Sequence, residues 1–166
     1  MRLTYLAAMA LLLATPAAAQ DRLVDVAIPE GVAQIMREEG YKAVVKTREN
    51  GSIHIEGAQG KWTFEVDFYS CHLVKGCESL QFYAWYKREP GYTLERINLW
   101  NSSKRFLKVA IDKDDNLETT MDVSLVGKTT YANFADTLDW WSVMSSDLFD
   151  FLDKKPDAET KPPAKP

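Results

Sequence analysis

Residues 70–86, SCHLVKGCESLQFYAWY, hold both cysteines of this 166-residue chain and one of its two histidines. Cys71, His72 and Cys77 could bind a metal, form a redox-active thiol pair or form a disulfide. A structural zinc site needs four ligands, and these residues supply three. The other histidine, His54, falls in a different predicted hairpin, so the fourth ligand is missing. A thioredoxin-like pair has two residues between its cysteines, whereas five separate these. We therefore expect no metal ligand and no redox centre here.

Residues 1–19 have the layout of a secretory signal peptide. Arg2 precedes an apolar run at residues 6–14, and three alanines before Gln20 fit the small-residue rule for cleavage. The run is too short to span a membrane, and a buried N-terminal helix is disfavoured because no polar face interrupts the run. The sequence predicts a periplasmic or secreted protein of Gram-negative type, cleaved between Ala19 and Gln20.

Export favours a disulfide between Cys71 and Cys77. Disulfides persist in oxidising compartments, and two cysteines this close together suit a local bridge between neighbouring strands. Closing so short a ring stabilises the fold by about 2 kcal/mol through loop-closure entropy. The sulfur atoms would then be unavailable for catalysis.

Other matches to functional motifs fail at their defining positions. Residues 127–130, GKTT, resemble the end of a phosphate-binding loop, but Asp122 stands where its first glycine belongs. Residues 112–116 resemble the start of a calcium loop, but Leu117 replaces the glycine and Val123 the bidentate glutamate. We therefore expect no catalytic residue and no cofactor. A small periplasmic hydrolase that uses some of the 24 acidic side chains is the alternative that the sequence leaves open.

Charge and composition restrict the remaining classes of protein to which the chain could belong. A net charge of −4 with scattered lysines argues against nucleic-acid binding. No second apolar stretch of membrane-spanning length follows the signal peptide, so we expect no integral membrane segment. Residues 154–166 carry four prolines and no large apolar side chain, which predicts a disordered tail. We expect one domain at residues 20–153.

Changes of hydrophobic period divide this domain into helices and strands. Asn50-Gly51 suits a tight hairpin, and residues 62–69 alternate strictly, as a half-buried antiparallel strand does. We expect helices that begin near Pro29, Thr93 and Thr130, and strands at 41–47, 52–56, 62–69, 79–87, 105–111 and 117–125. The order α-β-β-β-β-α-β-β-α predicts an α+β fold, a twisted antiparallel sheet with helices packed on one face.

Two sets of aromatic residues suggest contact surfaces. Alternation places Tyr69, Tyr83 and Trp85 opposite the main apolar rows, where large rings often mark a partner-binding surface. The alternative is that the third helix or the tail covers them. The long helix carries a wide apolar stripe, which is either core packing or a homodimer seam; it includes Trp140, Trp141, Met144 and Leu148.

Short motifs across most of the domain resemble the YbjN-domain family. They are Gly40-Tyr41, Phe68-Tyr69 before Cys71, the run at 76–82, Ile97-Asn98, Trp100-Asn101 and Arg105-Phe106. The resemblance covers roughly residues 26–152. It implies a fold similar to class I type III secretion chaperones, which are often dimeric, and a role as a sensory-transduction regulator without established enzyme activity or cofactor. The signal peptide, the cysteine pair and the proline-rich tail depart from the typical cytoplasmic member.

The predicted second helix places Leu94, Ile97 and Trp100 on an apolar face, with Asn98 and Asn101 three residues apart on another. Near a helix C-terminus, asparagine amides can satisfy unpaired backbone carbonyls and fix the turn into the next strand. We favour this structural role over ligand binding.

The expected function is therefore that of an exported, non-enzymatic module that binds an unidentified protein or peptide. The contact would use the open sheet face or an unpaired edge strand. The alternatives are the hydrolase above and a structural envelope protein that forms a homodimer through its long helix.

Overall fold

The computed structural model describes residues 22–73 and 76–154. The predicted signal peptide and all but the first residue of the predicted tail lie outside the described residues, so both stay predictions. Among the described residues, no helix has the length and apolar character needed to cross a membrane.

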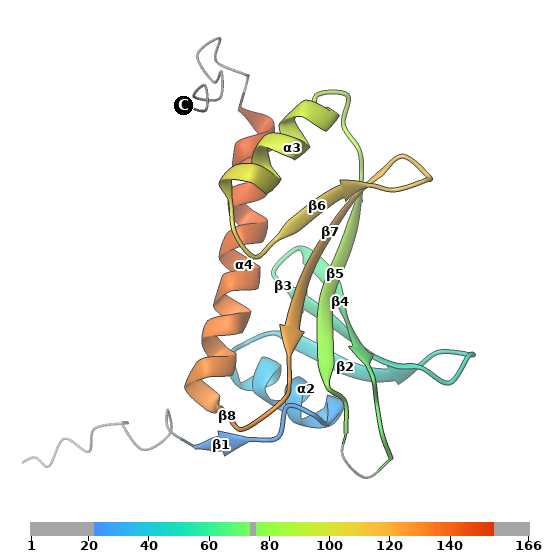
Figure 1. Cartoon of the computed structure of the whole chain (residues 1–166), viewed down its shortest axis with the longest axis vertical. Helices are drawn as coiled ribbons and strands as arrows, with labels where there is room; N and C mark the ends of the chain where they lie inside the picture. The colour runs from blue at the N-terminus through green and yellow to red at the C-terminus, as the bar shows by residue number, and fades with distance from the viewer. Residues whose placement is uncertain (1–21, 74–75, 155–166) are drawn as a thin grey trace, which may run out of the picture.

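A six-stranded sheet, antiparallel throughout, forms the centre of the domain (Figure 1), and its strand order is β2-β3-β4-β5-β7-β6. The strands are β2 (Lys42–Thr47), β3 (Ile53–Gln59), β4 (Trp62–Tyr69), β5 (Ser79–Lys87), β6 (Lys108–Ile111) and β7 (Asn116–Ser124). Sequence neighbours pair along the sheet, except that β7 lies between β5 and β6.

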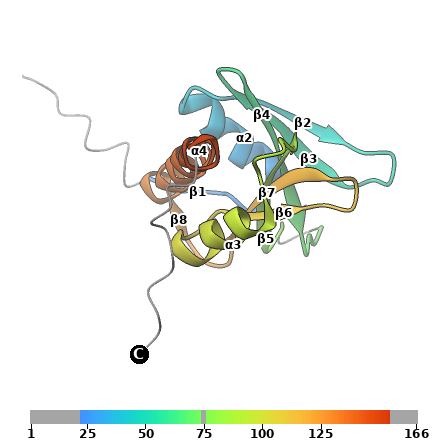
Figure 2. The same cartoon turned by 90° about the horizontal axis from the view of Figure 1, so that it is seen from above.

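In the part of the chain that the structure describes, three helices lie on one side of this sheet (Figures 1 and 2), and they are α2 (Pro29–Glu38), α3 (Leu94–Ser103) and α4 (Tyr131–Asp153). The predicted α+β fold and its order of elements are confirmed. A two-stranded ribbon of β1 (Leu23–Val24) and β8 (Thr129–Thr130) was not predicted, because two residues are too few to show a period.

Local chemistry fixes where the helices begin. Pro29 occupies the first turn of α2, where its missing N–H costs nothing. The Thr93 hydroxyl accepts a hydrogen bond from the N–H of Arg96 at 3.4 Å, and the Thr130 hydroxyl accepts one from the N–H of Asn133 at 3.2 Å. Both threonines are N-caps, and both stand where the sequence predicted that a helix begins.

Aromatic packing joins α4 to the middle of the sheet. The ring of Trp141 stacks on that of Phe82 with 5.4 Å between centroids, and it lies 5.5 Å from the ring of Phe64. Gly57 makes room for this cluster, because a Cβ atom there would lie 2.6 Å from the Phe64 ring. The core therefore lies between the sheet and the helices.

Two sequence predictions near α3 were wrong. The strand expected at 105–111 begins only at Lys108, because Phe106 adopts a positive φ of 69° that is incompatible with an extended strand. Leu94, expected on the buried face of the helix, is 66% exposed. As the first residue of α3, it lies at the helix end, and Ile97 and Trp100 alone reach the core.

Side chains of α3 close the β6 edge of the sheet. The Asn101 side chain donates to the carbonyl of Val109 at 2.8 Å and accepts from the N–H of Val109 at 3.0 Å. One residue earlier, the Trp100 indole N–H donates to the carbonyl of Leu107 at 3.0 Å. Asn101 thus pairs with β6 as a neighbouring strand would, rather than with the carbonyls of its own helix.

Hydrogen bonds also hold the C-terminal end of α4 against the connection between β5 and α3 and against the first turn of α3. The Tyr92 hydroxyl donates to an Asp153 carboxylate oxygen at 2.8 Å, and the guanidinium of Arg96 donates to the carbonyl of Phe151. Burial, together with the hydrogen bond to Asp153, raises the pKa of Tyr92 to about 12. The last turn of the longest helix is therefore fixed to the same chain segment that leaves β5.

Replacing Asn101 should weaken the fold, whereas replacing Asn98 should not. We expect Asn101→Ala to lower the free energy of unfolding by about 1–2 kcal/mol, because the buried N–H and carbonyl of Val109 lose their partner. Asn98 is the matched control, since its exposed side chain makes no hydrogen bond within the described residues. Urea denaturation measures both, and equal effects of the two substitutions would contradict the edge-closing role.

Tyr92→Phe should also destabilise the chain, by about 1–2 kcal/mol, because it removes a hydrogen bond to a carboxylate. Since the folded state raises this pKa, the contribution is complete below about pH 10 and is lost as pH rises through 12. Urea denaturation at pH 7 and pH 11 should show a smaller difference between wild type and variant at the higher pH. Tyr83→Phe is the control, and an equal loss there would argue against the Asp153 contact.

Candidate functional site

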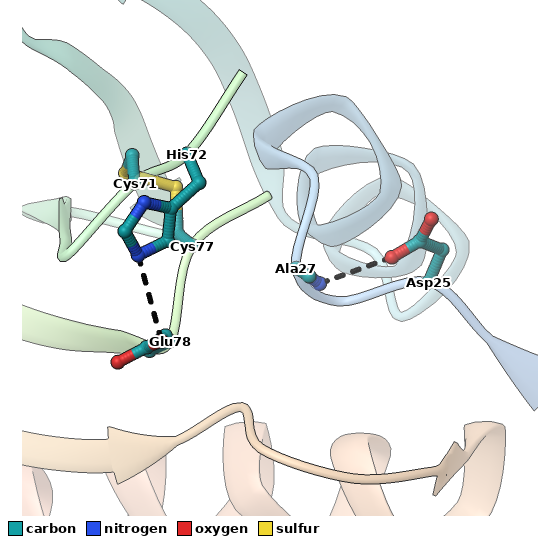
Figure 3. The surroundings of a disulfide bond; sticks show 6 residues. All are labelled: Asp25, Ala27, Cys71, His72, Cys77 and Glu78. Carbon is teal, nitrogen blue, oxygen red and sulfur yellow. Dashed lines mark hydrogen bonds and ion pairs between the residues drawn. A yellow bond between two sulfur atoms is a disulfide. The ribbon is translucent and has the colours of Figure 1, made fainter. Parts of the chain in front are cut away.

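The disulfide loop joins β4 to β5 beside the segment that precedes α2 (Figure 3). Cys71 and Cys77 are bonded, with 2.15 Å between their sulfur atoms. His72 and Gly76 exchange two backbone hydrogen bonds across the loop, at 2.8 and 3.0 Å. The N–H of Cys77 donates to the carbonyl of Ala27 at 2.8 Å. The bridge thus closes a short loop, and the hydrogen bond from Cys77 joins this loop to the chain that enters α2.

The two histidines have different surroundings. His72 is exposed, and its Nε2 lies 3.5 Å from a carboxylate oxygen of Glu78 (Figure 3). His54, on β3, is only 6% exposed, and its Nδ1 has no hydrogen-bond partner among the described residues. Within that part of the chain, no group of three or more His, Cys, Asp or Glu side chains is arranged to hold a metal ion.

The three aromatic residues predicted to mark a partner surface share the helix-free face of the sheet, which we call the open face. Phe82 is buried under α4, and successive side chains of a strand point to opposite faces. Tyr83, the next residue, and Trp85, two residues after it, therefore lie on the face of β5 that is opposite to Phe82. Tyr69 lies on the same side of β4. Trp85 is 59% and Tyr69 46% exposed, and all three helices lie on the other side (Figure 2). The described residues therefore leave this face uncovered.

A hollow of about 620 Å³ lies on the open face. Val44, Tyr83 and Trp85 contribute apolar surface to it, while Lys42 and Glu56 add charge. Val44 is itself 52% exposed. The lining thus combines apolar surface with charged side chains, which suits a site that holds a partner's apolar side chain and selects its neighbours by charge.

Ion pairs cover one part of the open face. Arg48 donates to Glu65 and to Asp67, in the second case at 2.6 Å. Lys46 lies 2.8 Å from Glu56, and the hydrogen bond from Lys46 lowers the pKa of that carboxyl group. These exposed pairs add little stability.

Negative charge gathers around Tyr83. Burial, followed by the charges of Glu118, Asp112 and Glu65, raises the pKa of Tyr83 above its ordinary value. Glu118 lies directly opposite Trp85 on the neighbouring strand and makes no ion pair among the described residues. A partner that contacts these two aromatic rings would therefore meet carboxylates beside them.

The hydrolase alternative gains no support from the hollow. Glu56 and Glu65 lie opposite each other on β3 and β4, close enough to suggest a carboxylate pair. A general acid needs a raised pKa, whereas Lys46 lowers that of Glu56. Arg48 meanwhile engages Glu65. No catalytic assignment follows from this arrangement.

Helix α4 uses most of its apolar stripe in the core. Trp141, Met144 and Leu148 are buried against the sheet. Trp140 is partly exposed, and its ring lies 4.8 Å from that of Phe106. Three of the four residues proposed for a core or dimer helix are thus core residues, and the homodimer stays a prediction.

Comparisons with known proteins bear on family and fold. A family model named YbjN, described as "Putative bacterial sensory transduction regulator", matches residues 29–154. No curated protein matches the chain. The crystal structure of Escherichia coli YbjN, described there as "a putative transcription regulator", is similar with a TM-score of 0.50 and 18% identity, covering 74% of this chain and 87% of that one.

A second solved structure is the Yersinia pestis type III secretion chaperone SycH in complex with a stable fragment of YscM2. It has 16% identity and a TM-score of 0.48, and the match covers 70% of this chain and 95% of that one. The family match, in contrast, spans most of the domain described above, from the first turn of α2 to the end of α4. The chain belongs to the YbjN family.

Proposed function

We propose that this protein is a non-enzymatic binding module that captures a segment of a partner protein on its open face. The observation that carries the proposal is the hollow beside Tyr83 and Trp85, which lies on the one side of the sheet that no described helix covers. Exposed tryptophan and tyrosine next to a concave surface are typical of binding hot spots.

The outer edges of the sheet are less suited to strand addition. Asn101 occupies both backbone groups of Val109 on β6. On β2, at the other edge, the Arg37 side chain donates to the carbonyl of Ala43 at 3.1 Å. A partner strand would have to displace these side chains, whereas contact with the open face displaces none of them.

The chemistry of the open face specifies the partner segment. The apolar rings suit an aliphatic, aromatic or proline anchor, and the carboxylates near them suit lysine or arginine on either side of that anchor. Binding should therefore weaken as salt rises, because the charges lie near the surface and are screened.

A regulatory role and an exported location complete the proposal. The family description, a regulator of sensory transduction, supports a module that acts by binding another protein. The signal-peptide layout of residues 1–19 supports export, and the neighbouring cysteines suit an oxidising compartment.

Photo-crosslinking tests the binding face. With benzoylphenylalanine in place of Tyr83, we expect a crosslinked partner in cells that express the chain. The matched control places the crosslinker at Val143, an exposed position of α4 on the other side of the molecule. A partner captured from position 143 but not from position 83 would contradict the proposal.

Trp85→Ala should weaken capture of that partner by at least about tenfold, the loss typical of a hot-spot residue. Because the Trp85 side chain is exposed, the melting temperature should remain that of the wild type. Capture that is unchanged in this variant would exclude the hollow as the contact surface.

Export has its own test. Mass spectrometry of the protein recovered from the periplasmic fraction should give a chain that begins at or near Gln20, with Cys71 and Cys77 unreactive toward thiol reagents in denaturant. An intact Met1, or two free thiols, would argue against cleavage and export.

A further inference from the structure

The segment that follows α4 has the composition that the open face suits. Residues 155–166, KPDAETKPPAKP, contain four prolines and three lysines. Within it, Lys161 and Lys165 flank the pair Pro162-Pro163. Proline-rich sequences favour the extended polyproline conformation, and aromatic-lined grooves recognise them in many proteins.

The structure fixes where this segment starts. Asp153, the last residue of α4, accepts the hydrogen bond from Tyr92 at 2.8 Å. Tyr92 belongs to the connection that leaves β5, and β5 carries both Tyr83 and Trp85. In Figure 1 the end of α4 and the end of β5 lie at the same end of the molecule. The segment therefore departs close to the strand that lines the hollow.

The segment is also long enough. Twelve residues in a polyproline conformation, at ~3.1 Å each, extend about 37 Å. Trp85 precedes Tyr92 by seven residues, which span at most about 25 Å even when fully extended. Lys161 and Lys165, the seventh and eleventh of these residues, lie about 22 and 34 Å along the segment. The N–H of Tyr92 donates to the carbonyl of Glu89 at 2.9 Å, which folds the connection, so Trp85 lies nearer to Tyr92 than this limit and both lysines can reach the open face.

The spacing of charges agrees with that of the lysines. Glu65, which also pairs with Arg48, lies opposite Tyr83 on one side of β5, and Glu118, which makes no ion pair among the described residues, lies opposite Trp85 on the other. A lysine beside Glu65 would therefore share that carboxylate with Arg48. Glu65 and Glu118 are two strand spacings apart across the sheet and two residues apart along it, or about 12 Å diagonally. Four residues of polyproline helix, the separation of Lys161 and Lys165, also span about 12 Å.

We propose that residues 161–166 of the same chain lie across the open face, with Pro162 and Pro163 against Tyr83 and Trp85 and the two flanking lysines beside Glu65 and Glu118. The inference rests on the proposed function, because the tail occupies the surface assigned to the partner. The tail then competes with the partner, which must displace it to bind.

Paramagnetic broadening in the purified chain tests the docked tail. The two native cysteines form a disulfide, so a thiol-specific nitroxide label attaches only to the new cysteine of Ala164→Cys. The five tryptophan indole N–H signals, assigned with single Trp→Phe variants, then report the position of the label. We expect selective loss of the Trp85 signal, while the Trp140 signal on the helix side keeps its intensity.

Charge reversal in the tail is the matched control. Lys161→Glu combined with Lys165→Glu should restore the Trp85 signal of the labelled chain, and high salt should restore it in part. Broadening of Trp140 in place of Trp85, no broadening of any tryptophan, or broadening that persists after charge reversal would overturn the docked tail.

The same charge-reversed variant separates this inference from the proposed function. With the crosslinker at position 83, it should capture more partner than the wild-type tail does. If the labelled chain shows selective Trp85 broadening but position 83 captures no partner, the tail contact stands and the partner-binding function fails. If position 83 captures partner equally with either tail and Trp85 is not broadened, the function stands and the tail contact fails.

Discussion

The packing of Trp141 on Phe82 and Phe64 decides which face of the sheet is buried. Side chains alternate along a strand, so burying Phe82 under α4 directs Tyr83 to the opposite face, and Trp85 with it. A shift of one residue in the pairing of β4 with β5 would exchange the two faces. The aromatic core thus determines which side of the sheet becomes the open face, although none of the core rings is exposed there.

Because side chains cover both edge strands of the sheet, the open face is the surface best placed to contact a partner. A sheet offers a partner two edges and a face, and an exposed edge also invites unwanted pairing between chains. Here α3 closes the β6 edge through Asn101, and α2 covers a carbonyl of the β2 edge through Arg37. The two shorter helices therefore have a second role besides covering the core, since they leave the face as the surface where contact displaces no side chain that is bonded to the backbone of an edge strand.

Local sequence patterns predicted the elements well where a period was long and unbroken. Strict alternation predicted both ends of β4 and β5 at the correct residue, and the apolar stripe predicted the ends of α4 to within one or two residues. The predicted beginning of β6 was wrong because alternation does not reveal the positive φ of Phe106, whose ring packs against Trp140 of a distant segment. The partner of Asn101 and the hollow were beyond prediction for the same reason: both arise where elements meet in space.

Weak contacts are sufficient to hold a tail that is covalently attached. A short flexible linker presents its end at an effective concentration in the millimolar range, so a contact whose dissociation constant is itself millimolar is already about half occupied. Two exposed lysine–carboxylate pairs and two prolines on aromatic rings can supply interactions of that order. A partner with a larger apolar anchor displaces such a tail at a cost of less than tenfold in apparent affinity. The tail would then exclude weak ligands of similar chemistry while it scarcely hinders a strong one, which makes it a device for specificity rather than for inhibition.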